Sequence, residues 1–301
     1  MSSAHDLLAL AVSREASDVH IKAGAPPYFR VRGNLIESGL PAVDREALGR
    51  LVHDLLPPHL KARPEPGLEL DFSHHEDGVG RFRVNVFVAR GIPTLAFRYV
   101  KTRIPTLQEL SLPPVLETLA LADSGIILLC GATSSGKSTT LAALLDSINR
   151  RQRCRIITVE DPVEYIFADR QSVITQREVG LDTASFHSAL KHVLRQDPDV
   201  IMIGEMRDPV SLSVALSAAE TGHLVLSTLH VNSAAQSVHR ILDFFPHAER
   251  EQVRLTLAAT LVAALCQRLV PLKAGGVRAA VEVLINTPTV RKLILENKLD
   301  T

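Results

Sequence analysis

Cysteine is scarce in this sequence, and its three cysteines stand far apart at Cys130, Cys154 and Cys266. No two of them form a C-x-x-C pair. This usage argues against a disulfide framework and against a zinc site built from paired cysteines.

A surplus of positive charge is also missing, because 33 Lys and Arg balance 33 Asp and Glu. The chain therefore has no overall positive field to gather nucleic acid, which lowers the expectation of a DNA translocase. Long hydrophobic runs are absent too, since the most apolar stretch, 255–266, is about half of the roughly 20 residues that cross a bilayer. Residues 1–17 have no basic leader and carry Asp6, so they do not predict a secretory signal. We expect a soluble cytoplasmic protein without nucleic acid as a partner.

What the sequence does have is an ordinary globular composition, with 46% apolar and 22% charged residues in a chain of 301. That length has room for two compact domains. The first, 1–100, reads as a small α+β unit. Its period-two and helical patterns predict helices at 4–15 and 44–56 and strands at 18–22, 28–32, 68–73, 80–89 and 94–99.

The pattern changes after about residue 100, where a proline-rich stretch leads into the second predicted domain, 101–301. Short apolar runs there alternate with helical patterns, and we expect buried strands at 126–130, 156–159, 200–203 and 224–228. Continuous apolar strands separated by helices predict an α/β fold with a parallel sheet that is covered on both faces.

A phosphate-binding motif follows the first of these strands, because residues 131–138 match G-x-x-x-x-G-K-[ST]. The glycines let successive N–H groups face the phosphates, Lys137 reaches the outer phosphates, and the Ser138 hydroxyl binds Mg²⁺. An apolar strand before the motif and the helical stretch TTLAALLDSIN after it favour this interpretation over a plain Gly-Ser loop. The residues expected to bind nucleotide are Gly131, Ala132, Thr133, Ser134, Ser135, Gly136, Lys137, Ser138 and Thr139.

Polar clusters follow three further strands, at the carboxyl ends where ligands bind in such sheets. They are EDPVE at 160–164, GEMRD at 204–208 and LH at 229–230. An ATPase needs one carboxylate near Mg²⁺ and another that orients or deprotonates the attacking water, and Glu205 and Glu164 suit these tasks. The alternatives are a solvated turn in which Pro162 starts a helix, a helix N-terminal acid for Glu205, and a packed or surface histidine for His230.

Together these motifs resemble the secretion ATPase superfamily, and within it the type IV pilus retraction ATPases of the PilT/PilU family. The resemblance covers nearly the whole chain. It includes ASDVHIKAGAPPYFRVRGNL, GRFRVNVFVARG, ITVEDPVEYIF, QREVG, LRQDPDVIMIGEMRD and AAETGHLVLSTLHVNSAAQSVHRILDFFP. It implies a PAS-like N-terminal domain, a RecA-like P-loop ATPase domain and assembly into a homo-hexameric ring.

The resemblance also assigns roles residue by residue. It implies that Lys137 and Ser138 bind phosphate and Mg²⁺, that Glu164 is the catalytic base and that Glu205 is the Walker B acid, holding Mg²⁺ through water. His230 becomes the histidine-box residue. The stretches FRVNVF and AFRYV place the two catalytic arginines of the N-terminal side at Arg83 and Arg98, for which the alternative is two surface strand arginines.

The function so implied is ATP-driven pilus retraction at the cytoplasmic face of the inner membrane. An inner-membrane platform protein is the expected partner, with peripheral membrane contact only, and a paralogous retraction ATPase is a further one. Alternatives are a pilus-assembly or type II secretion ATPase, whose extra N-terminal sequence and four-cysteine insertion are missing here, an accessory PilU-like subunit and a RecA-type translocase. The loop differs from the usual GPTGSGKST at Ala132 and Ser134, and the C-terminus, ending at TVRKLILENKLDT, is expected to be shortened.

Overall fold

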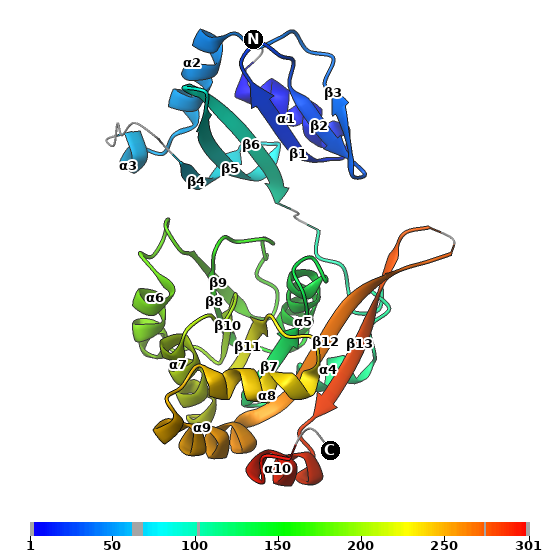
Figure 1. Cartoon of the computed structure of the whole chain (residues 1–301), viewed down its shortest axis with the longest axis vertical. Coiled ribbons are helices and arrows are strands. Elements are labelled where there is room, and N and C mark those ends of the chain that lie inside the picture. The colour runs from blue at the N-terminus through cyan, green and yellow to red at the C-terminus, as the bar shows by residue number, and fades with distance from the viewer. Residues whose placement is uncertain (1–2, 62–68, 101–102, 274, 299–301) are drawn as a thin grey trace. The chain divides into compact units, whose positions relative to one another are not determined.

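The computed structural model describes residues 3–61, 69–100, 103–273 and 275–298. They belong to two compact units, 1–102 and 103–301, each of which is described by itself (Figure 1). Among the described residues, no helix is both long and apolar enough to cross a membrane.

The N-terminal unit is an antiparallel six-stranded sheet of order β3-β2-β1-β6-β5-β4. Its strands are β1 (Ala16–Lys22), β2 (Tyr28–Val31), β3 (Asn34–Glu37), β4 (Leu70–Glu76), β5 (Gly80–Ala89) and β6 (Ile92–Val100), and its helices are α1 (Ala4–Ser13), α2 (Arg45–Leu55) and α3 (Pro58–Lys61). Apolar side chains of α1 and α2 share one buried cluster with one face of the sheet. The helices and strands predicted for this unit are confirmed to within a few residues, apart from residue 68, which lies outside the described residues.

Local sequence explains where these helices begin. Ser3 and Asp6 form a reciprocal capping box at the start of α1, and the Asp44 carboxylate accepts from the Ala47 N–H at the start of α2. Such caps satisfy N–H groups that have no partner inside the helix. Helix starts are thus encoded by residues next to the apolar periodic stretches.

The face of this sheet opposite the helices is polar and carries the two predicted catalytic arginines. Because side chains alternate along a strand, Val84 and Phe97 lie in the core, whereas Arg83 and Arg98 lie on the other face. The two arginines are direct cross-strand neighbours in β5 and β6, and Asp18 of β1 is the next residue in the same row. The antiparallel pairing thus gathers both arginines at one place.

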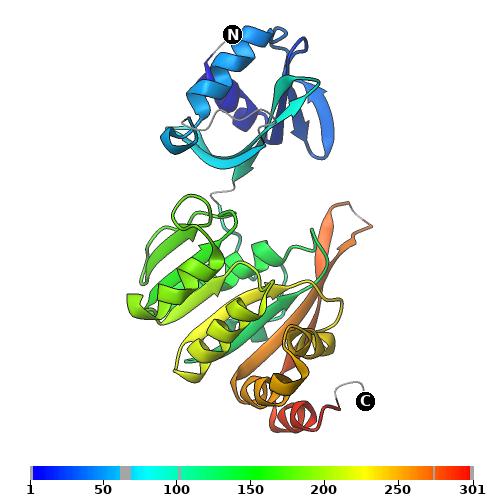
Figure 2. The same ribbon diagram turned by 60° about the vertical axis from the view of Figure 1, so that its left-hand side comes forward.

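The C-terminal unit is a seven-stranded sheet of order β13-β12-β7-β11-β10-β8-β9, parallel except for β13. The strands are β7 (Gly125–Cys130), β8 (Arg155–Glu160), β9 (Val173–Glu178), β10 (Val200–Ile203), β11 (Leu224–Leu229), β12 (Leu261–Pro271) and β13 (Val277–Ile285). The helices are α4 (Val115–Leu119), α5 (Lys137–Arg151), α6 (Phe186–Val193), α7 (Pro209–Glu220), α8 (Ala234–Asp243), α9 (His247–Thr260) and α10 (Pro288–Leu295), with a 3₁₀ turn η1 (Leu194–Gln196). Figure 2 shows β12 and β13 as a long hairpin at one edge.

Both faces of this sheet are covered, as its continuous apolar strands predict. One buried cluster joins alternate residues of the central strands to α6, α7, α8, α9 and Ile294 of α10. The other joins the intervening residues to α4, α5 and the segment containing Leu107 and Leu112. The four predicted strands are confirmed as β7, β8, β10 and β11, and the helix predicted after the phosphate motif is α5.

Three strands of this sheet, β9, β12 and β13, were not expected from the sequence. The apolar stretch 255–266 contains both the end of α9, at Thr260, and the start of β12, at Leu261, with no glycine or proline between them. Periodicity does not separate a buried helix from a buried strand in so short a run. The sheet is therefore wider than predicted.

Candidate nucleotide site

The phosphate loop connects β7 to α5 and bends at two glycines. Gly131 has φ 141° and Gly136 has φ 88°, both in the region that L side chains rarely adopt. A Cβ at Gly131 would collide with the carbonyl oxygen of Gln267, and a Cβ at Gly136 would lie 2.6 Å from Gln267 Nε2. Each glycine is therefore required both by backbone conformation and by the close approach of β12.

Lys137, the first residue of α5, is buried and folds back over this loop. Its Nζ donates to the carbonyl oxygens of Gly131 and Ala132, at 2.8 Å each. Burial lowers its pKa, while the negative charge of Glu164 acts in the opposite direction. Gly136, the N-cap of α5, supplies no side-chain cap to the helix. A buried ammonium group at an uncapped helix N-terminus is suited to an anion of several charges.

Three neighbouring parallel strands bring the other candidates to the same edge of the sheet. His230 follows β11, Glu205 follows β10 and Glu164 lies in the loop after β8. His230 Nε2 is 3.6 Å from a Glu205 oxygen, and the other Glu205 oxygen pairs with Arg207. Burial lowers the pKa of His230, and the charges of Lys137 and Arg207 lower it further, which favours the neutral imidazole.

The helices that the structural alternatives gave to two of these acids are not found, although the turn that carries Glu164 is exposed, as its alternative expected. Glu205 is not a helix N-terminal acid, because α7 begins at Pro209 and its capping carboxylate is Asp208. The acidic turn after β8 does not start a helix at Pro162, since no helix occurs between Glu160 and Phe186. Neither acid caps a helix, and Glu164 is exposed at the sheet edge.

Whereas Glu164 in the following turn is exposed, Glu160, the last residue of β8, has a buried side chain. Its Oε1 accepts from Thr158 Oγ1 at 2.7 Å and from Gln176 Nε2 at 3.0 Å. Its pKa is raised, chiefly by burial, although these two donors favour the charged form. Neighbouring acids of one turn therefore have different environments.

Glu160→Gln is expected to stabilise the protein more at pH 8 than at pH 5. The folded state raises the Glu160 pKa, so wild-type stability declines as pH rises from the unfolded pKa through the folded one. The glutamine oxygen still accepts from Thr158 and Gln176 but has no charge to desolvate. Urea unfolding of both proteins at the two pH values measures the difference, and an equal gain at both would contradict the assignment.

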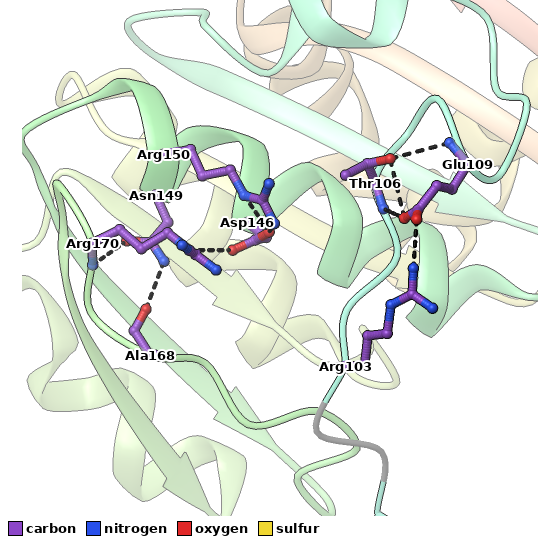
Figure 3. Close-up of polar contacts among 8 residues, drawn as sticks. All are labelled: Arg103, Thr106, Glu109, Asp146, Asn149, Arg150, Ala168 and Arg170. Carbon is purple, nitrogen blue, oxygen red and sulfur yellow. Dashed lines mark hydrogen bonds and ion pairs between the residues drawn. The ribbon is translucent and has the colours of Figure 1, made fainter.

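The loop that carries Glu164 is fastened to both ends of α5. At the N-terminal end, the hydroxyl groups of Tyr165 and Thr139 lie 2.8 Å apart. At the other end, Asn149 Nδ2 donates to the Ala168 carbonyl at 2.9 Å, and Asn149 Oδ1 accepts from the Arg170 N–H at 3.1 Å (Figure 3). The helix that begins at the phosphate loop thus also positions the loop of the predicted base.

Charged pairs reinforce the same attachment. Asp146 of α5 is buried and pairs with Arg150 Nε at 2.8 Å and with Arg170 Nε at 3.4 Å (Figure 3). A buried carboxylate is stable only when its charge is paired, and two guanidinium groups pair the charge of Asp146. Figure 3 also shows the start of this unit, where Glu109 accepts from the Thr106 N–H at 2.8 Å.

Arg83 and Arg98 belong to the N-terminal unit, whereas the candidate residues described above belong to the C-terminal unit. The Arg98 Nε donates to Asp18 at 2.8 Å, with the arginine side chain 70% exposed and the carboxylate 10% exposed. The Arg83 Nε is 3.4 Å from Asp71. Both arginines lie at the surface, on the face of the sheet opposite the buried cluster that α1 and α2 share with it.

The donors for Mg²⁺ fit that ion. Ser138 lies in the first turn of α5 and offers a hydroxyl, and Glu205 offers a carboxylate that is 20% exposed. Mg²⁺ prefers oxygen ligands and retains several waters, so one hydroxyl and one water-bridged carboxylate are a suitable pair.

Sequence reasoning assigned no role to Arg207, Tyr165 or Asn149. Arg207 stands in the quoted cluster GEMRD, so an arginine two residues after the acid was a usable signal. The sequence carries no comparable signal for Tyr165 and Asn149, because their partners lie 26 and 19 residues away in the chain.

A parallel sheet with a glycine-bent phosphate loop, a buried lysine and acids at the adjacent strand ends defines a RecA-like P-loop fold, here with an N-terminal sheet-rich domain. Residues 4–292 match the family described as type II/IV secretion system protein, and the chain belongs to that family. The resemblance inferred from the motifs is confirmed.

Relatives within the family are similar over almost the whole chain. The chain is 41% identical to the type IV pilus retractation ATPase PilT of Pseudomonas aeruginosa, over 98% of its own length and 86% of that protein. It is 42% identical to the type IV pilus ATPase PilU of the same bacterium, over 97% and 77% of the two lengths. A crystal structure of the pilus retraction motor PilT with bound ADP matches with a TM-score of 0.95 and 43% identity, over 100% of this chain and 88% of that one.

Proposed function

We propose that this protein is a motor ATPase that hydrolyses ATP to drive type IV pilus retraction. The observation that carries the proposal is the position of Lys137 in a glycine-bent loop, on the sheet edge that also holds Glu164, Glu205 and His230. The 41% identity to a pilus retractation ATPase along almost the whole chain supports the same function.

The roles of the residues follow from charge and position. The loop N–H groups and Lys137 bind the phosphates, and Glu164 accepts a proton from the attacking water. His230, 3.6 Å from Glu205 at the same sheet edge, is placed to sense the terminal phosphate. Mg²⁺, held by Ser138 directly and by Glu205 through water, would neutralise charge on the phosphate oxygens.

Arg83 and Arg98 complete the site from another subunit of a homo-hexamer. Their guanidinium groups stabilise charge on the transferring phosphoryl group only when the N-terminal domain of one subunit closes on the ATPase domain of its neighbour. Hydrolysis is then coupled to domain movement, as in other phosphoryl-transfer enzymes with an arginine finger.

Retraction requires that the movement act on a membrane-embedded partner. We place the ring at the cytoplasmic face of the inner membrane, in peripheral contact with a platform protein that releases pilin subunits. A second candidate function is that of an accessory retraction subunit acting with a paralogue, which the 42% identity to PilU favours.

Lys137→Ala is expected to abolish nucleotide binding, ATP turnover and pilus retraction, because it removes the buried cation of the phosphate loop. ATP turnover of the purified protein and retraction in cells that lack any paralogue measure the two levels. Lys191→Ala, on an exposed position of α6, is the matched control and should change neither. Full retraction by the Lys137 variant in those cells would exclude the motor function.

A further inference from the structure

A buried glutamine on β12 holds the phosphate loop from the side opposite the predicted catalytic residues. β12 pairs with β7 on one side, whereas β11, which leads to His230, pairs with β7 on the other. Gln267 is only 4% exposed and follows Cys266, whose Cα is paired with that of Cys130, the residue before the loop. The side chain of Gln267 therefore lies directly beside the start of the phosphate loop.

Both ends of the Gln267 amide are bonded to the loop and to the helix that follows it. Its Nε2 donates to the Ser135 carbonyl oxygen at 2.8 Å, and its Oε1 accepts from Thr140 Oγ1 at 2.8 Å. The Ser135 carbonyl can only accept, so this contact fixes which way the amide is turned. The two bonds bridge the loop and the first turn of α5.

The glycines of the loop are adapted to the same residue. A side chain at Gly131 would collide with the main chain of Gln267, and one at Gly136 would collide with its amide group. Backbone and side chain of one residue thus contact both bends of the loop. An apolar side chain of similar volume would fill the space but would leave the Ser135 carbonyl and the Thr140 hydroxyl without these partners.

We propose that Gln267 is a positioning residue for nucleotide binding, which keeps the loop in its phosphate-binding shape and connects the β12–β13 hairpin to the occupancy of the site. The ligand class is a nucleoside di- or triphosphate, so the inference rests on the nucleotide binding proposed above. The Nε2–Ser135 bond is the essential part, because Ser135 lies within the loop itself. The Thr140 bond secures the helix that follows.

Three variants separate positioning from stability. Gln267→Met keeps the volume and removes both bonds, and Gln267→Glu keeps an acceptor for Thr140 but sets a carboxylate against the Ser135 carbonyl oxygen. Asn286→Leu is the matched control, because the Asn286 amide donates to the Ala258 and Leu261 carbonyls, at 2.9 and 2.7 Å, and so anchors the opposite end of β12. The affinity of a fluorescent ADP analogue and the unfolding temperature without nucleotide are measured for each full-length protein.

Loss of two buried hydrogen bonds is expected to weaken analogue binding by about tenfold in Gln267→Met. Gln267→Glu should weaken it at least as much, although its side chain has the same size. Asn286→Leu should lower the unfolding temperature and leave the affinity within about twofold of wild type, because distant sites act independently. Wild-type affinity in both Gln267 variants, or an equal loss in Asn286→Leu, would overturn the positioning role.

The failure of this inference is distinguishable from failure of the proposed function. If the wild-type protein binds the analogue without hydrolysing ATP or driving retraction, the motor function fails while the affinity series still decides the role of Gln267. If the wild-type protein turns over ATP and the Gln267 variants bind like it, only the positioning role fails.

Discussion

Replacing Arg98 with alanine is expected to lower ATP turnover by about a thousandfold, the lower end of what an arginine finger contributes. The variant should still bind ADP with wild-type affinity, because Arg98 belongs to the N-terminal unit and the phosphate loop to the C-terminal one. Turnover per subunit, measured over a range of protein concentrations, checks both the loss and its origin in a neighbouring subunit. Wild-type turnover should rise steeply as subunits assemble, and the variant should remain low throughout.

Within its own unit, Arg98 already has an ion-pair partner. Its guanidinium is held by the nearly buried carboxylate of Asp18 at 2.8 Å, and Arg83 lies directly across from it in β5. The exposed part of the arginine lies on the sheet face opposite α1 and α2, where the described residues leave it accessible to a second subunit. Arg98 therefore has an ion-pair partner in its own subunit, and the exposed part of its side chain can contact a second subunit.

Arg32→Ala is the matched control for the Arg98 substitution. Arg32 is 83% exposed and pairs with Glu15 at 3.3 Å in the same unit, so its loss removes an arginine of equal charge. Exposed pairs of this kind contribute little to stability. Turnover that is independent of both protein concentration and Arg98, across the range where oligomers form, would show that each subunit hydrolyses ATP alone and would exclude the ring mechanism.

Glu164→Gln is expected to lower kcat by about a hundredfold or more, the usual contribution of a general base. Glutamine has the same shape but accepts no proton at neutral pH. Glu164 is exposed in a loop that Tyr165 and Asn149 fasten to α5, so the substitution should leave the loop in place. The affinity for ADP is expected to stay close to that of wild type.

Single-turnover hydrolysis and ADP binding separate these effects, since the first reports chemistry and the second binding. Glu251→Gln, at an exposed position of α9, is the control for loss of one carboxylate. If the Glu164 variant hydrolyses ATP at the wild-type rate, another group must be the base. Glu205 is the next acid at that sheet edge.

Much of the sheet that carries the site could be predicted because its strands are short, apolar and bounded by polar turns. The runs at 126–130 and 200–203 are buried throughout, as expected for strands covered on both faces. The placement of the acids at one edge of the sheet followed from the parallel arrangement, whereas the order of the strands came from the structure. The strands at 80–89 and 94–99 were likewise predicted, and the alternation within them places Arg83 and Arg98 on the face away from the core.

Other parts of the site depend on contacts that no local pattern encodes. Gln267 lies 132 residues from Ser135 in the chain, and its strand begins inside an apolar run that also ends a helix. The bond of Tyr165 to Thr139 likewise arises from packing between elements. Such partners are selected by three-dimensional proximity, and a single sequence does not report it.

The division of the predicted catalytic groups between two units has a consequence for genetics. Lys137 and Arg98 belong to different units of the chain, and in the proposed ring each active interface takes one from each of two neighbouring subunits. An allele that lacks the lysine and an allele that lacks the arginine are each null alone. Expressed together, they form mixed rings in which some interfaces combine the intact lysine of one product with the intact arginine of the other. The two mutations should therefore complement each other in trans, although they lie in one gene and destroy one activity.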